Sequence, residues 1–425
     1  MPNLNQHAPL RFITAGSVDD GKSTLIGRLL YDSKALLGDH LRQIEAAGSA
    51  PDFSALTDGL EAEREQGITI DVAYRYFSTA RRKYIIADTP GHEQYTRNMV
   101  TGASTAHAAV LLLDASQLDY HQTPLQLLPQ TKRHSAILHH LRCPHIIVAI
   151  NKMDLLDYDE TKYRAIVAAY DALAAQLGLA DVHYIPISAL NGDNLVHASR
   201  HTPWYSGDTL LATLEALPVG ESVNDAPAAF HFPVQNVLRA DGSKQDDFRG
   251  YQGRIEAGSV RVGDRVRVEP AGQESTVREI IGINGSVATA SVGENITLRL
   301  ADDIDISRGD TLIAAANPRS GQRELHATLC WFDQRPLNPA RKYLLKHTTR
   351  TVPAKIRRVE HVWDVHTLSN YADRDTLAMN DLGEVSLVLQ QPVAATPYAE
   401  NPATGAFILI DDASNQTVAA GMILA

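Results

Sequence analysis

Short apolar runs alternate with longer stretches of helical periodicity in the first half of the chain. Near-continuous apolar runs of this kind are typical of parallel strands that are buried on both faces. Strands are predicted at residues 12–15, 72–77, 84–87, 110–113, 146–150 and 184–187, and several of them are such runs. Helices are predicted between them at residues 23–30, 135–141 and 163–177. This order predicts an α/β fold with a doubly wound, mostly parallel sheet.

The pattern changes near residue 217. Beyond it, short alternating segments such as 259–262 and 265–268 are separated by Gly-Asp and Asn-Gly turns, and no strong helical period recurs. Such a pattern is typical of all-β barrels. The segment 317–321, Asn-Pro-Arg-Ser-Gly, is a predicted junction between two barrels. The domains expected are an α/β domain over 1–217 and β-barrel domains over 218–318 and 319–425.

Charge and composition narrow the class of protein. The 39 basic and 50 acidic residues give a formal charge of −11, which repels phosphate backbones and argues against nucleic acid as a partner. No basic, then apolar, targeting segment is visible at the start, and no apolar run approaches the ~20 residues that cross a bilayer. With only Cys143 and Cys330, we expect a cytoplasmic protein with reduced thiols and no membrane partner.

Residues 16–23, Gly-Ser-Val-Asp-Asp-Gly-Lys-Ser, fit the phosphate-binding pattern GxxxxGK[ST]. The glycines let the backbone curl so that its N–H groups face phosphate, and the following helix N-terminus adds to this positive field. Lys22 would contact the β and γ phosphates, and the Ser23 hydroxyl would bind Mg²⁺. A simple glycine turn is the alternative, but the predicted strand before it and the helix after it favour a P-loop.

Asp88-Thr89-Pro90-Gly91-His92 follows the predicted strand at 84–87. A carboxylate at the C-terminal end of a strand lies where α/β sheets bind ligands, so Asp88 can hold a magnesium-bound water. Gly91 can bring its N–H to a γ-phosphate. Thr69, in Gly67-Ile68-Thr69, can close over the nucleotide and bind Mg²⁺. Each motif alone could be an ordinary turn or helix end; their order after the P-loop favours the nucleotide role.

Asn151-Lys152-Met153-Asp154 follows the predicted strand at 146–150. The Asp154 carboxylate can accept from the N1–H and N2 amino groups of guanine, and it would face an acceptor on adenine. A site built on such bonds rejects the wrong base strongly. Asn151 can bond the other edge of the base and brace neighbouring loops, and the Lys152 stem can cover the ring. Ser188-Ala189 can offer a backbone N–H to guanine O6.

In this order, and with two barrels following, these motifs resemble those of the translational GTPases. Thr-Pro-Trp-Tyr at 202–205 is similar to the elongation factor 1α branch. Within that branch, five stretches resemble the large subunit of bacterial ATP sulfurylase, the sulfate adenylyltransferase family. They are 16–30, 58–79, 88–104, 247–250 and 303–309. Elongation factors usually carry other residues at Asp20 and at 93–95, and the segment 117–130 is longer than the family pattern.

The resemblance implies a G domain followed by two barrels, with GTP and Mg²⁺ as ligands. It implies a GTPase whose hydrolysis drives a smaller catalytic subunit to make adenosine 5′-phosphosulfate and pyrophosphate from ATP and sulfate, in a heterodimer or higher assembly. Because the sequence holds one P-loop, an adenylyl-sulfate kinase would be a separate protein. The GTP-binding residues implied are Gly16, Ser17, Val18, Asp19, Asp20, Gly21, Lys22, Ser23, Thr24, Asp88, Thr89, Pro90, Gly91, His92, Asn151, Lys152, Met153, Asp154, Ser188 and Ala189.

The resemblance also assigns roles around the reacting phosphate. His92 would orient the attacking water, with Val18 and Ile68 as an apolar gate that holds it back. Ser23, Thr69 and Asp88 would hold the magnesium. Two other functions stay open: an elongation factor 1α-like carrier of aminoacyl-tRNA, and a GTPase-fold scaffold without turnover. The net charge and the sulfurylase-like stretches disfavour the first, and the intact motifs disfavour the second.

Overall fold

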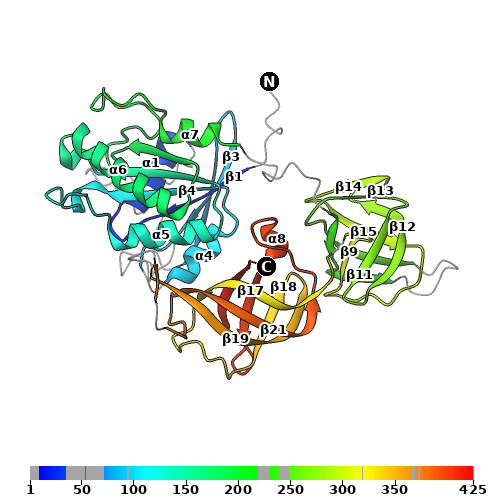
Figure 1. Cartoon of the computed structure of the whole chain (residues 1–425). Coiled ribbons are helices and arrows are strands. Elements are labelled where there is room, and N and C mark those ends of the chain that lie inside the picture. Colours follow the sequence, from blue (N-terminus) through cyan, green and yellow to red (C-terminus); the bar gives the residue numbers. More distant parts are fainter. Residues whose placement is uncertain are drawn as a thin grey trace. The chain divides into compact units, whose positions relative to one another are not determined.

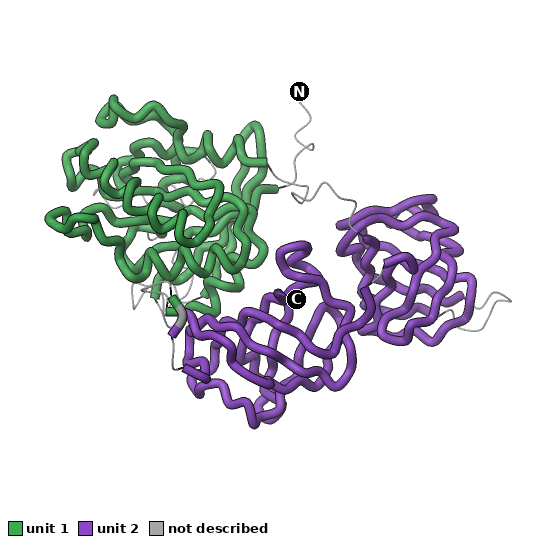
Figure 2. Tube along the Cα trace, in the orientation of Figure 1, with its two compact units in different colours: residues 1–220, 364–369 green, residues 221–363, 370–425 purple. Residues whose placement is uncertain are grey.

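The chain forms two compact units (Figure 2). The computed structural model describes residues 9–34, 53, 71–92, 95–218, 229–239, 248–317, 319–364, 369–371 and 374–424. Unit 1 comprises residues 1–220 and 364–369, and unit 2 comprises residues 221–363 and 370–425. The predicted borders after residues 217 and 318 stay predictions.

Unit 1 is built on a six-stranded sheet in the order β2-β3-β1-β4-β5-β6 (Figure 1). All neighbouring pairs are parallel except β2 with β3, which confirms the predicted α/β fold with a mostly parallel sheet. Its strands are β1 (Leu10–Ala15), β2 (Ala73–Ser78), β3 (Lys83–Asp88), β4 (Ala108–Asp114), β5 (His145–Asn151) and β6 (Val182–Pro186). Its helices are α1 (Lys22–Asp32), α4 (Thr96–Ala103), η3 (Ala115–Gln117), α5 (Pro129–His140), η4 (Met153–Leu156), α6 (Glu160–Leu177) and α7 (Leu210–Ala216).

Helices cover both faces of this sheet, and its central strands are mostly apolar. Every residue of β4 is buried. On one face, Leu25 of α1 and Leu214 of α7 join a single core with side chains of β1, β4 and β5. On the other face, Gly102 of α4 lies against Ile13 and Ala87. Parallel strands need such double cover, because neither face can then meet water.

Two local features go beyond or differ from the sequence prediction. A strand was predicted at residues 72–77 without a place in the sheet, and β2 is an antiparallel edge strand with Tyr74 and Tyr76 exposed. Aromatic residues suit central and edge strands alike, so composition could not separate the two. α5 begins at Pro129 rather than at residue 135, since proline at the first turn already has a helical φ and lacks an N–H that needs a partner.

Unit 2 contains two antiparallel β-barrels, as predicted. The first uses β7 (His231–Pro233), β8 (Asn236–Arg239), β9 (Arg249–Arg254), β10 (Ser259–Arg261), β11 (Arg265–Glu269), β12 (Gln273–Gly282), β13 (Gly285–Val287), β14 (Thr289–Ser291), β15 (Asn295–Leu300) and β16 (Thr311–Ala314). The second uses β17 (Gln322–Trp331), β18 (Tyr343–His347), β19 (Arg350–Asp364), β20 (Ser369–Asn370), β21 (Leu382–Val393), the short helix α8 (Pro402–Gly405), β22 (Ala406–Asp411) and β23 (Thr417–Ile423).

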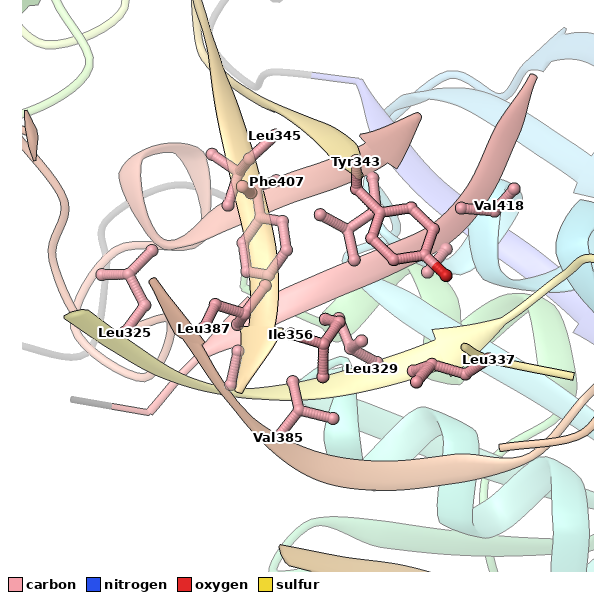
Figure 3. Close-up of a cluster of buried hydrophobic side chains, with 14 of the residues drawn as sticks. Leu325, Leu329, Leu337, Tyr343, Leu345, Ile356, Val385, Leu387, Phe407 and Val418 are labelled. Atoms are coloured by element: carbon pink, nitrogen blue, oxygen red, sulfur yellow. The ribbon is translucent and has the colours of Figure 1, made fainter. Parts of the chain in front are cut away.

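The second barrel closes because β18 pairs with both β22 and β19. Closure removes free strand edges along this ring. Its interior is filled by aliphatic and aromatic side chains such as Leu329, Leu345 and Phe407 (Figure 3). Phe407 lies directly opposite Gly421 in the β22–β23 ladder.

Two further expectations concern thiols and membranes. Cys143 and Cys330 are both buried, and neither takes part in a disulfide. Burial raises the pKa of the Cys143 thiol to about 12. Across the described ranges, no helix is both long and apolar enough to cross a membrane.

The Phe407–Gly421 pair gives a test of barrel packing. A Cβ at residue 421 would lie 2.2 Å from the Phe407 ring, so we expect Gly421→Ala to destabilise unit 2 by about 1–3 kcal/mol. Gly282→Ala is the matched control, because the nearest atom there is 3.7 Å away. Urea unfolding of both variants measures the difference. Equal free energies of unfolding for Gly421→Ala and the wild type would contradict this packing.

Candidate nucleotide site

A cavity of about 550 Å³ lies in unit 1 where loops follow β1, β3, β5 and β6. These loops meet because parallel strands end at the same edge of a sheet, where α/β proteins bind ligands. The cavity is lined by Val18, Asp19, Gly21, Lys22, Ser23, Thr24, Gly91, Asn151, Lys152, Asp154, Leu155, Ala189 and Leu190. Parts of four separate sequence motifs therefore share one cavity.

The loop between β1 and α1 has the tight shape that the glycines predicted. Asp19 and Gly21 have φ values of 66° and 93°, in the left-handed region that glycine adopts without strain. At Gly21 a side chain is excluded for a second reason, because a Cβ there would lie 2.6 Å from Asn151 Nδ2. Glycine at residue 21 therefore lets the asparagine amide reach the loop.

Lys22 lies inside this loop and is almost wholly buried. Its ammonium donates to the carbonyl oxygens of Gly16 and Ser17, at 3.0 and 2.6 Å. Burial lowers the pKa of Lys22, against the opposing effect of Asp20. A polyanion in the cavity would favour the charged form of this lysine and would compete with the two carbonyls for it.

Asp20 supports the loop from within. Its carboxylate accepts from the Ser17 N–H, so that amide is turned toward Asp20. Burial raises the pKa of the Asp20 carboxyl to about 6, despite the lowering effect of Lys22. The side chain is absent from the cavity lining. Its contribution is to loop shape, a role that the motif alone did not specify.

The segment after β3 is fixed to β1. The Thr14 hydroxyl donates to Asp88 Oδ1 at 3.0 Å, and the Thr89 hydroxyl donates to the Thr14 carbonyl at 2.6 Å. Gly91 is buried and lines the cavity, whereas His92 is exposed and does not. The His92 ring lies edge-on to Tyr95, with their centroids 6.2 Å apart.

The Asn151 side chain joins three loops. Its Nδ2 donates to the Asp20 carbonyl at 2.7 Å, and its Oδ1 accepts from the Ala189 N–H at 2.9 Å. Asn151 was expected to brace neighbouring loops. These two bonds connect it to the loop after β1 and to the loop after β6. The Ala189 N–H already has a partner, so a guanine O6 would have to share it with Asn151.

Beside it, Lys152 has a left-handed φ of 62°. Its ammonium forms an ion pair of 2.7 Å with the buried carboxylate of Asp114, at the end of β4. This pair holds the lysine stem along the cavity wall, next to Asp154. Sequence reasoning missed Asp114, although its place at the C-terminal end of an apolar strand is the same signal that pointed to Asp88.

The other predicted residues fall around the cavity without lining it. Met153 and Ser188 are fully buried, and the Ser188 hydroxyl accepts from the Asn191 N–H at 3.2 Å. Of the GTP-binding residues expected, those outside the lining are Gly16, Ser17, Asp20, Asp88, Thr89, Pro90, His92, Met153 and Ser188. Thr69 and Ile68 lie outside the described residues.

Leu155 and Leu190 line the cavity and were missed. Each follows a recognised motif directly and is largely exposed, at 64% and 59%. Exposed leucines beside a cavity can flank a planar ring. The sequence signal for them was an apolar residue directly after residues 151–154 and directly after residues 188–189.

The side-chain oxygen atoms near Lys22 suit a magnesium ion that is held mainly by phosphates. Ser23 lines the cavity, and Asp88 is held in place at the end of β3 by Thr14. Among the described residues no cluster of three metal-binding side chains occurs. Mg²⁺ typically takes one or two protein oxygens and completes its shell with water and substrate phosphates, so these residues fit the ion.

Comparison with known proteins gives the family. Residues 8–219 match the elongation factor Tu GTP binding domain, and residues 324–424 match the GTP-eEF1A C-terminal domain-like family. The chain is 47% identical to sulfate adenylyltransferase subunit 1 of Cellvibrio japonicus, over 98% of this chain and 86% of that protein.

Two longer relatives match as well. The chain is 49% identical to the bifunctional enzyme CysN/CysC of Mycobacterium tuberculosis, over 98% of this chain and 67% of that enzyme. It is 47% identical to the bifunctional enzyme NodQ of Rhizobium meliloti, over 97% of this chain and 63% of that enzyme. Identity at this level along nearly the whole chain shows that it belongs to the sulfate adenylyltransferase subunit 1 family, whose first domain is of the elongation factor Tu GTP-binding type.

Proposed function

We propose that this chain binds and hydrolyses GTP as the GTPase subunit of a sulfate adenylyltransferase. GTP hydrolysis would drive a partner subunit to form adenosine 5′-phosphosulfate and pyrophosphate from ATP and sulfate. The observation that carries the proposal is the single cavity that joins Lys22 and Gly91 to Asn151 and Asp154. Family membership supplies the sulfate chemistry.

The base would lie between Leu155, Leu190 and the Lys152 stem, which all line the cavity. Asp154 would accept from the two donors of guanine. Adenine lacks both donors at these positions, so its binding would leave the carboxylate desolvated without a partner, a loss that supports discrimination.

The phosphates would lie against the loop before α1. Lys22 would exchange its bonds to the Gly16 and Ser17 carbonyls for phosphate oxygens, and the Gly91 N–H would meet the γ-phosphate. Ser23 and Asp88, with Thr69, would hold a magnesium ion, which when bound neutralises the charge on the β and γ phosphates.

Hydrolysis needs a water in line with the γ-phosphorus. His92 would orient that water, which attacks the γ-phosphorus while the bond to the β-phosphate oxygen breaks, giving GDP and phosphate. His92 is exposed and outside the cavity lining, so it must move toward the phosphate to act. Val18, which lines the cavity, would form one side of the gate on its path.

Adenylyl transfer to sulfate is uphill, because the product holds a phosphate–sulfate anhydride. A second hydrolysis coupled through conformational change can drive it. The sequence carries one P-loop and one nucleotide site, so the adenylylation centre is assigned to a smaller partner subunit. The relative from Cellvibrio japonicus is named a sulfate adenylyltransferase subunit, which favours sulfate activation over delivery of aminoacyl-tRNA.

Guanine specificity is tested at Asp154. We expect Asp154→Asn to weaken GTP binding and to favour XTP, because the C2 oxygen of xanthine can accept from the new amide. Competition binding with GTP, XTP and ATP measures the preference. A variant that keeps the wild-type preference for GTP over XTP would show that Asp154 does not read the base.

The division of roles at the phosphate is tested by two variants. We expect His92→Ala to keep GTP affinity but to slow hydrolysis by ~10²-fold or more, as loss of a proton-transfer or water-orienting group does. Lys22→Ala should lower affinity and rate together. Nucleotide binding and single-turnover hydrolysis measure both, and equal loss of affinity in the two variants would reject the assignment.

Coupling is tested with the partner. We expect GTP hydrolysis by the chain to accelerate when the catalytic subunit, ATP and sulfate are all present, and adenosine 5′-phosphosulfate yield to depend on GTP. The GTPase rate with the partner is compared with and without ATP plus sulfate. A rate that responds to ribosomes and ignores ATP and sulfate would replace the proposal by the translation-factor alternative.

A further inference from the structure

Gln130, in the first turn of α5, reaches the segment that follows β3. Its amide nitrogen Nε2 donates to the Gly91 carbonyl oxygen at 3.0 Å. The same nitrogen lies 2.9 Å from Nε2 of His134, one turn further along the helix. The Gln130 side chain thus contacts both Gly91 and the buried His134.

The Gly91 carbonyl determines which of these nitrogen atoms carry hydrogen. A carbonyl oxygen can only accept, so the nitrogen of the Gln130 amide must face it. That amide nitrogen carries two hydrogens, and the second points at His134 Nε2, which must therefore hold a lone pair. The His134 hydrogen is then on Nδ1. Burial lowers the pKa of His134 to about 3, with Lys22 and Arg133 adding to the effect, so the ring is neutral.

This arrangement leaves an uncompensated group. His134 is 2% exposed, and within the described ranges its Nδ1 has no hydrogen-bond partner. A buried donor without an acceptor is destabilising and uncommon in native proteins. An apolar side chain at residue 134 would avoid that cost. What an apolar side chain could not supply is the acceptor that fixes the Gln130 amide.

On its other side, Gly91 is pressed against the P-loop. A Cβ at this residue would lie 2.5 Å from Lys22 Nζ and 2.7 Å from the Gly16 carbonyl oxygen. Gly91 is therefore held between the P-loop and Gln130. Its carbonyl and the N–H of His92 belong to one planar peptide unit, so the bond from Gln130 sets the orientation of the peptide from which His92 extends.

We propose that Gln130, braced by His134, is a positioning residue for GTP hydrolysis: it orients the Gly91–His92 peptide so that His92 can reach the attacking water. This inference rests on the proposed GTPase function. It extends that function to a residue of α5, outside the motifs that bind the nucleotide, and it gives the buried imidazole a role.

Three variants of the full chain test it. Gln130→Met keeps the length of the side chain and removes the donor, and Gln130→Glu keeps its size and polarity but places an acceptor against the Gly91 carbonyl. Gln126→Met is the matched control, because Gln126 is exposed and its side chain donates locally, to the Pro124 carbonyl at 3.2 Å. Single-turnover GTP hydrolysis, GDP affinity and thermal unfolding are measured for each.

We expect both Gln130 variants to lower the hydrolysis rate constant by about tenfold or more, as small misplacements of catalytic groups do. GDP affinity should stay at the wild-type value, and Gln126→Met should match the wild type in every measurement. If Gln130→Met does not fold, the hydrolysis rate and GDP affinity of Gln130→Glu test the inference.

Wild-type hydrolysis rates in both Gln130 variants would overturn the inference while leaving the GTPase function intact. So would a loss of GDP affinity in step with the rate, since that would make Gln130 a general support of the site. A wild-type chain that binds GDP but does not hydrolyse GTP would instead overturn the proposed function itself, and the inference with it.

Discussion

The two hydrogen bonds of the Asn151 side chain hold the nucleotide cavity together. One amide nitrogen and one amide oxygen, on a single planar group, connect the Asp20 carbonyl of the P-loop to the Ala189 N–H of the last base loop. Aspartate has the same shape but cannot donate, so it would set two acceptors against each other at Asp20. Because all three groups are buried, breaking either bond leaves a desolvated polar atom without a partner. The base end and the phosphate end of the cavity thus depend on one side chain.

This connection is possible because the sheet is parallel. β1, β3, β5 and β6 all end at the edge where the cavity lies, so residues more than a hundred positions apart come within hydrogen-bond distance. The same geometry explains the second link in the site, from Gly91 to α5 through Gln130. In both links a side-chain amide contacts the backbone of a distant loop. Amides suit this role, because they can donate and accept without carrying a charge into a buried place.

The parts of the fold and site that sequence could predict are those encoded locally. Apolar runs located the central strands, and the motifs singled out Lys22, Asn151 and Asp154, which line one cavity. Their roles toward a nucleotide stay predictions. The position of β2 at the edge of the sheet could not be predicted locally, because it depends on which strands pair with it. Asp114 ends an apolar strand as Asp88 does, but its ion pair with Lys152 could not be predicted from that position. Gln130 matters through its contact with Gly91, which no local pattern encodes. The role expected for Thr69 stays a prediction, because that residue lies outside the described ranges.

Hydrogen–deuterium exchange can show whether Asn151 connects the base loops to the phosphate loop. Backbone exchange would be followed in peptides that cover residues 16–24 and 188–191, in the wild type, in Asn151→Ala, and in Asn236→Ala as an exposed control. We expect faster exchange in both peptides in Asn151→Ala only, although the substitution lies 131 residues from Asp20. Unchanged exchange at residues 16–24 in Asn151→Ala would contradict it.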